Sequence, residues 1–136
     1  MASLKNFASR MIVLADKVEK NAEKLVKEVA SKSLANVVYD TPVDTGRARA
    51  NWIVNMGSSS NYSTIKQDKI GYTAVGKGNA VIEKYKSGDV IYITNNVDYI
   101  VKLDNGWSKR WQPESGYVER SIKAGIYSVK MSVLEK

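Results

Sequence analysis

The segment Thr41–Trp52 (TPVDTGRARANW) constrains the fold of this chain more than any other. Pro42 has no backbone N–H and disfavours helical geometry in the residue before it, so a helix that precedes this segment should end at Thr41. Gly46 tolerates the positive φ that many turns require. From Arg47 onward, polar residues alternate with alanine and tryptophan, which predicts the start of a strand. We therefore expect one short segment to fix the angle between a helix and a sheet.

The residues before this segment have the spacing of one helix face. Apolar side chains recur every three or four positions, at Leu4, Phe7, Met11, Leu14, Val18, Ala22, Leu25 and Val29. A helix of about 36 residues would be about 54 Å long, which exceeds the width of a domain of this size. We therefore expect residues 1–40 to form a long helix that bends or partly projects. Its first turns either cover the core or contact another subunit through Phe7 and Met11.

The remainder of the chain predicts a small sheet followed by a second helix. Residues 56–79 are rich in Gly, Ser, Asn and Lys, as in a flexible loop or arm, and residues 79–85 could form two helical turns. Residues 90–94 (VIYIT) are β-branched and aromatic, with apolar side chains on both faces, which predicts a central strand. Alternation over residues 99–103 predicts a second strand or extended segment. Helical spacing from Tyr117 predicts a C-terminal helix within residues 113–136.

Together these patterns predict a single α+β domain over residues 1–136. A long N-terminal helix and a C-terminal helix would pack on a small, mainly antiparallel β-sheet. The length of 136 residues suits one domain with its own core. No run of apolar residues is long enough to span a membrane.

The residue types argue against an enzyme, a metal site and a cofactor. The chain has no Cys and no His, which removes thiolate zinc sites and the commonest general base. The segment Gly71–Gly78 (GYTAVGKG) nearly matches a phosphate-binding loop, but its last residue lacks the hydroxyl that holds magnesium. The acidic pairs Asp98 with Asp104 and Asp40 with Asp44 lie in turn-like contexts, where Asp is expected for backbone reasons.

The charge pattern suggests an acidic partner. The net charge of +7 is spread evenly along the chain, whereas a nucleic-acid-binding arm would concentrate it. Arg47 and Arg49 share one face of the predicted strand, where they could face a channel or a partner and contact phosphates of passing DNA or carboxylates. A solvated outer face is the alternative.

Two tryptophans suggest a protein interface. Trp107 and Trp111 flank Lys109 and Arg110, and Trp and Arg dominate the binding energy of many interfaces. The alternative is that one or both tryptophans fold back onto the sheet.

Two sequence blocks together resemble a known family. The first is Thr41–Trp52, and the second is Ile91–Tyr99 (IYITNNVDY) continuing through Leu103–Lys109 (LDNGWSK). Both resemble the small neck and tail-completion proteins, or head–tail joining proteins, of long-tailed bacteriophages, and the order of predicted elements also fits. The resemblance covers roughly residues 20–125. After Ser108–Lys109 the chain departs from the family, because RWQPESGYV is longer and bulkier than the usual Gln-Ala-Pro-Gly.

The resemblance implies a structural virion protein without catalytic residues or cofactors. Such proteins form rings, usually of six, between the head connector and the tail tube, around the channel for the genome. The implied partners are further copies of the chain in a hexamer or dodecamer, proteins of the portal side, and tail tube or terminator proteins. DNA would be contacted through its phosphates only, and no membrane is involved. The chain would occupy the host cytoplasm during assembly and the virion afterwards. The alternatives are a tail terminator that caps the tube and a sequence-independent nucleic-acid-binding protein.

Overall fold

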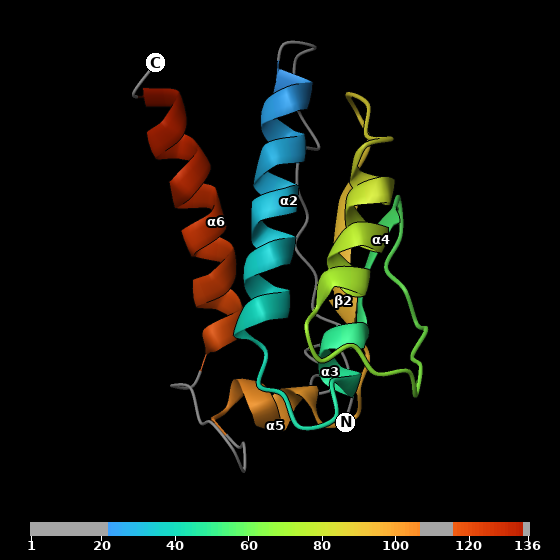
Figure 1. Cartoon of the computed structure of the whole chain (residues 1–136). Coiled ribbons are helices and arrows are strands. Elements are labelled where there is room, and N and C mark those ends of the chain that lie inside the picture. Colours follow the sequence, from blue (N-terminus) through green and yellow to red (C-terminus); the bar gives the residue numbers. More distant parts are fainter. Residues whose placement is uncertain (1–21, 107–115, 135–136) are drawn as a thin grey trace.

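The architecture is α+β, as the sequence predicts. The structure is a computed structural model that describes residues 22–106 and 116–134 (Figure 1). In chain order its elements are α2 (Glu23–Asp40), α3 (Arg47–Ala50), β1 (Trp52–Met56), α4 (Tyr72–Ile82), β2 (Ile91–Asn95), α5 (Ile100–Asp104) and α6 (Tyr117–Leu134). None of the described helices is long and apolar enough to cross a membrane.

Helix α2 is the centre of the arrangement, with α6 along one side and α4 on the other (Figure 1). Helix α4 packs over an antiparallel sheet in which β1 pairs with β2, Trp52 lying opposite Asn95 and Met56 opposite Ile91. The core between these layers holds fully buried side chains such as Leu34, Val37, Ile82 and Ile93. Helices α2 and α4 thus pack with the sheet around a core that a two-stranded sheet could not build alone.

Helix α2 ends where the sequence predicts. Its last residue is Asp40, and Thr41 adopts an extended conformation with φ −69° and ψ 124°. The helical pattern over residues 1–40 is thus confirmed for Glu23–Asp40, whereas Phe7, Met11 and the rest of residues 1–21 lie outside the described residues.

The hydroxyl of Thr41 joins three elements. Its O–H donates to the carbonyl of Val37, while its oxygen accepts from Trp52 Nε1 at 2.8 Å and lies 3.1 Å from the Tyr117 hydroxyl oxygen. Since a threonine hydroxyl has one hydrogen, and here it goes to Val37, Tyr117 must donate to Thr41. Thr41, Trp52 and Tyr117 are all buried. One polar atom therefore ties the end of α2 to β1 and α6.

The burial of Tyr117 predicts a loss of stability at alkaline pH. Burial raises the pKa of Tyr117 well above its usual value of 10.0. Below pH 10 the phenol is neutral in both states, whereas above it the unfolded chain ionises and the folded chain does not. Each further pH unit should therefore cost about 1.4 kcal/mol, until the folded-state pKa is reached. Urea unfolding at pH 8 to 11 should show this decline, and Tyr117→Phe should flatten it while Tyr127→Phe, at an exposed site, should not.

The predicted strand start at Arg47 is wrong, because residues 47–50 form the single turn of α3 and the strand begins at Trp52. Gly46 precedes this turn with φ 89°. A side chain there would also collide with the connecting chain, since the amide nitrogen of Lys69 lies 2.6 Å from the ideal Cβ position. Alternating alanines were a weak strand signal, because alanine favours helices.

The predicted strand at residues 99–103 is also wrong. This stretch belongs to α5, and the buried residues Val97, Ile100 and Leu103 recur every third position, as on a helix face. The strand predicted at residues 90–94 is confirmed as β2, but not as a central strand. The sheet of the described residues has two strands, so β2 has a strand neighbour on one side only.

The segment 56–79 is only partly a loop, because α4 begins at Tyr72. Asp68 caps this helix: its two carboxylate oxygens accept the N–H groups of Gly71 and Ala74, each at 2.9 Å. The bounds of 79–85 for a short helix were therefore wrong. Two glycines weakened the helical signal, yet Gly78 is needed because a Cβ there would collide with side chains of α2 and β1.

Residues 57–71, here called the connecting segment, are tied back to the domain. Asn51 accepts the N–H of Thr64 at 2.8 Å and donates to the carbonyl of the same residue at 2.9 Å. Asn96 donates to the carbonyls of Ser60 at 2.6 Å and Tyr62 at 3.3 Å. These bonds hold the segment beside the sheet, so it does not project as the arm that the composition suggested.

Candidate functional site

The two family-like blocks pack against each other in the structure. Trp52 at the end of the first block is paired with Asn95 in the second. The side chain of Asn95, which is buried, donates to the carbonyl of Ala48 at 2.9 Å and accepts the N–H of Val97 at 3.1 Å. Residues far apart in the sequence thus form one joint between α3, β1 and β2.

Arg47 extends this joint to the turn before α5. Its guanidinium lies 6.0 Å from the centre of the Tyr99 ring and 3.9 Å from the carboxylate of Asp98, and its Nε donates to the carbonyl of Thr64 at 3.2 Å. Burial raises the pKa of Tyr99, and Arg47 opposes this shift. Arg47 therefore contacts its own chain, and a channel-facing role for it remains a prediction.

Arg49 spans three parts of the backbone. It donates to the carbonyls of Tyr39 and Lys69, each at 2.8 Å, and of Thr41 at 3.0 Å. These carbonyls belong to the end of α2, the residue after it, and the connecting segment. The planar fork of a guanidinium carries its N–H donors on three nitrogens and can span separated acceptors, whereas the donors of a lysine ammonium all lie on one nitrogen. Arg49 therefore has a structural role, in which it ties the end of α2 and the connecting segment to α3.

We expect Arg49→Ala to lower the free energy of unfolding by about 2 kcal/mol and Arg49→Lys by about 1 kcal/mol, because lysine keeps the charge but not the three bonds. Urea unfolding of both variants, with Lys84→Ala as an exposed control, measures this. Arg49→Lys with unchanged stability would contradict the structural role and favour a role toward DNA or a partner.

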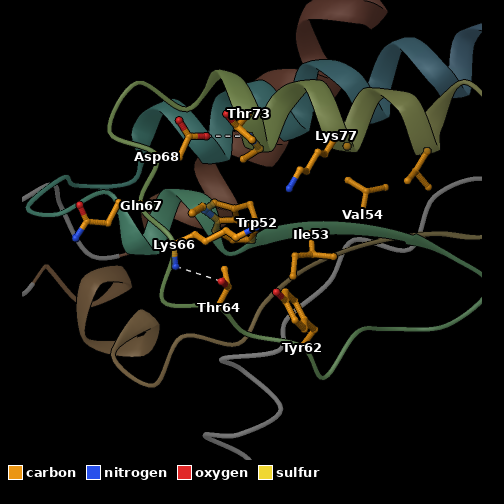
Figure 2. Close-up of a pocket in the computed structure, with 14 residues that line it drawn as sticks. Trp52, Ile53, Val54, Tyr62, Thr64, Lys66, Gln67, Asp68, Thr73 and Lys77 are labelled. Carbon is orange, nitrogen blue, oxygen red and sulfur yellow. Dashed lines mark hydrogen bonds between the residues drawn. The ribbon is translucent and has the colours of Figure 1, made fainter.

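A cavity of about 260 Å³ lies between α4, β1 and the connecting segment. Figure 2 shows Lys77 on α4 on one side of β1, and Tyr62 and Thr64 of the connecting segment on the other. Its lining residues come from these elements and the turn before β1: Ala50, Trp52, Ile53, Val54, Tyr62, Thr64, Lys66, Gln67, Asp68, Thr73, Ala74, Lys77, Gly78 and Val81. Its lining includes apolar side chains, such as Trp52 and Val54, and polar ones, such as Lys77.

The cavity lies at the outer edge of β1. Trp52 and Val54 are buried beneath α4, whereas Ile53 points to the other face of the sheet because side chains alternate along a strand. All three line the cavity, and no residue of β2 does. A cavity that contacts side chains from both faces of β1 must lie at an edge of that strand. Because β2 occupies one edge, the cavity lies at the other.

Three residues that the sequence raised for nucleotide or acid–base chemistry, Lys77, Asp40 and Asp104, have structural surroundings in the fold. Lys77 lies inside α4, five residues after its start, whereas a phosphate-binding loop would precede the helix. Asp40 accepts the hydroxyl of Ser121 at 2.6 Å, and Asp104 accepts the N–H of Val118 at 3.0 Å, so both carboxylates have structural partners. Within residues 22–106 and 116–134, no three His, Cys, Asp or Glu side chains gather where they could hold a metal ion.

No family model, curated protein or solved structure matches this chain. The joint and the cavity are therefore the features from which its function is inferred.

Sequence reasoning found some of these residues and missed others. It singled out Arg47 and Arg49, which both lie in α3, but their predicted shared face is wrong because side chains two positions apart on a helix point in different directions. Arg47 points toward Asp98 and Tyr99, whereas Arg49 points toward the end of α2. Trp107, Lys109, Arg110 and Trp111 lie outside the described residues, so their interface role stays a prediction.

The cavity residues were missed because α4 was not recognised as a helix. Thr73, Lys77 and Val81 are spaced by four and would have been assigned to one face of it. Two glycines within this stretch concealed that signal.

Proposed function

We propose that this chain is a structural virion protein that forms a ring at the head–tail junction of a long-tailed phage. It would join the head connector to the tail around the DNA channel. The mechanism is self-association and docking on virion partners, without catalysis.

The observation that carries this proposal is the joint between the two family-like blocks. Asn95 of the second block bonds to Ala48 of the first, and Trp52 is anchored on Thr41 of the same first block. Residues from the described part of both blocks therefore contact one another in the core, which supports a resemblance of the whole domain rather than of two short motifs.

A phage that produces this chain provides the direct test. Particles made without the chain should accumulate as filled heads and complete tails that are not joined, and the purified protein should restore joining. An electron-dense label on the chain should mark the collar of intact particles. Tails of uncontrolled length would instead indicate a tail terminator, and joined, infectious particles without the chain would contradict the proposal.

The tryptophans of the segment 107–111 supply a residue-level prediction. The double variant Trp107→Ala with Trp111→Ala should abolish incorporation into particles, because aromatic anchors dominate interface energies. The melting temperature of the purified protein should stay within about 2 °C of the parent. Parallel loss of incorporation and of melting temperature would place these side chains in the core instead.

A further inference from the structure

We infer that the cavity beside β1 is a docking site for an extended, acidic peptide segment of a partner protein. One apolar side chain of that segment would enter the cavity, and its carboxylates would pair with Lys66 and Lys77. This inference goes beyond the proposed function and does not depend on it.

Among the described residues, the edge of β1 away from β2 has no strand beside it, and because Val54 is only 5% exposed this edge faces the cavity rather than open solvent. Gly57 donates to the carbonyl of Val90 at 2.8 Å, and the register places these two residues opposite each other. In an antiparallel pair the bonded positions alternate, so Asn55 and Ile53 also direct their backbone groups toward β2. Val54, between them, directs its N–H and C=O outward, to the side where the cavity lies. No backbone partner for these groups occurs in the described ranges.

An outward-facing N–H and C=O in a strand are the groups that an added strand uses. Peptides bind in this way to exposed sheet edges, where main-chain bonds supply affinity and pockets for alternate side chains supply specificity. The cavity adjoins this edge and contains such a pocket, with Trp52 and Val54 as apolar lining. The edge therefore points to a polypeptide rather than to a small metabolite.

The size of the cavity agrees with a side chain. Its volume of about 260 Å³ lies below the range of about 300 to 1,000 Å³ that is usual for drug-sized ligands and cofactors. One leucine or phenylalanine side chain fits a space of this size.

The charge at the opening selects an acidic segment. Lys66 and Lys77 line the cavity from the connecting segment and from α4, and both are exposed. Neither forms an ion pair with a described carboxylate. Asp68, the acidic residue of the lining, has both oxygens occupied by the N-terminus of α4. The lysines are thus available to carboxylates of a partner, and the net charge of +7 would speed the encounter.

The test is a titration of the full-length, isotope-labelled protein, followed by NMR, with a capped peptide Thr-Glu-Thr-Phe-Thr-Glu-Thr. In an extended chain its Phe and both Glu side chains share one face. We expect shifts at the amide of Val54 and the indole of Trp52, and slower hydrogen exchange of the Val54 amide. The double variant Lys66→Glu with Lys77→Glu should bind at least tenfold more weakly, and Lys84→Glu with Lys102→Glu, at exposed lysines outside the cavity, within twofold of the parent.

Two further peptides complete the design. Replacing both Glu residues by Lys, or Phe by Ser, should each reduce binding at least tenfold. Equal binding of the Lys peptide, or no protection of Val54, would overturn the inference. A single-stranded oligothymidylate that shifts the same resonances as strongly would make this a phosphate site, and shifts that appear on concentrating the protein alone would assign the edge to a second copy. Either result would also refute the acidic-peptide assignment, and neither bears on whether the chain joins heads to tails.

Discussion

Replacing Thr41 with valine is expected to lower the free energy of unfolding by about 3 kcal/mol, because it leaves two buried donors without an acceptor. Valine has nearly the shape of threonine, so packing is preserved. The indole N–H of Trp52 and the hydroxyl of Tyr117 would both lose the oxygen to which they now donate. Both side chains are buried, at 4% and 3% exposure, so water cannot replace that oxygen without opening the core. Chemical unfolding monitored by Trp fluorescence measures the loss.

The same substitution at Thr94 is the matched control, with the opposite expected sign. Thr94 is fully buried, and its hydroxyl has no partner among the described residues. Thr94→Val removes that unsatisfied group and suits a strand, so stability should be unchanged or rise by about 1 kcal/mol. Equal losses of unfolding free energy at the two positions would mean that the threonine side chains only fill space. The Thr41 hydroxyl would then not stabilise the contacts with Trp52 and Tyr117.

The outcome at Thr41 bears on how much of the fold the sequence reveals. Periodicity and the effect of Pro42 were sufficient to place the end of α2, because both act through local backbone geometry. They could not reveal that the hydroxyl of Thr41 reaches Tyr117, 76 positions further along the chain. Contacts of that kind depend on how elements pack, which no local pattern records.

Two of the errors in the sequence reading share a physical cause. Alanine at 48 and 50 and glycine at 76 and 78 give little hydrophobic periodicity, so α3 and α4 were assigned to other structures. In both helices the small residue is needed for packing: Ala48 is buried beside the sheet, and Gly78 is covered by α2 and β1. The cavity was missed for the same reason, since its position follows from α4.

A small residue inside a helix can mark either a weak helix or a close packing contact. This distinction has its largest measurable consequence at Gly125. A glycine inside α6 suggests a weakened helix, yet Gly125 lies directly against α2 at Ser33. An ideal Cβ would be 2.7 Å from the hydroxyl oxygen of Ser33, 2.9 Å from its amide nitrogen and 3.0 Å from its Cα. The last two atoms belong to the backbone of α2, so a rotamer change cannot relieve the clash and the helices must move apart.

We therefore expect Gly125→Leu to lower the free energy of unfolding by about 3 kcal/mol or more, even though leucine has the better helix propensity. Gly125→Ala should cost less, because about 1 kcal/mol of propensity offsets the clash. Thermal and urea unfolding of both variants measure the effect. Ser33→Ala, which removes a hydroxyl without a partner among the described residues, should rescue Gly125→Ala only in part, since the backbone contacts remain.

The matched control is Gly76, a glycine within α4 whose Cβ position has no atom within 4 Å. With no neighbour to meet, Gly76→Ala should raise stability by about 0.5 to 1 kcal/mol through helix propensity alone. The two alanine variants thus separate propensity from packing with one side chain. If Gly125→Ala were as stabilising as Gly76→Ala, α6 would not lie against α2 at Ser33. The α2–α6 pair would then need a different arrangement.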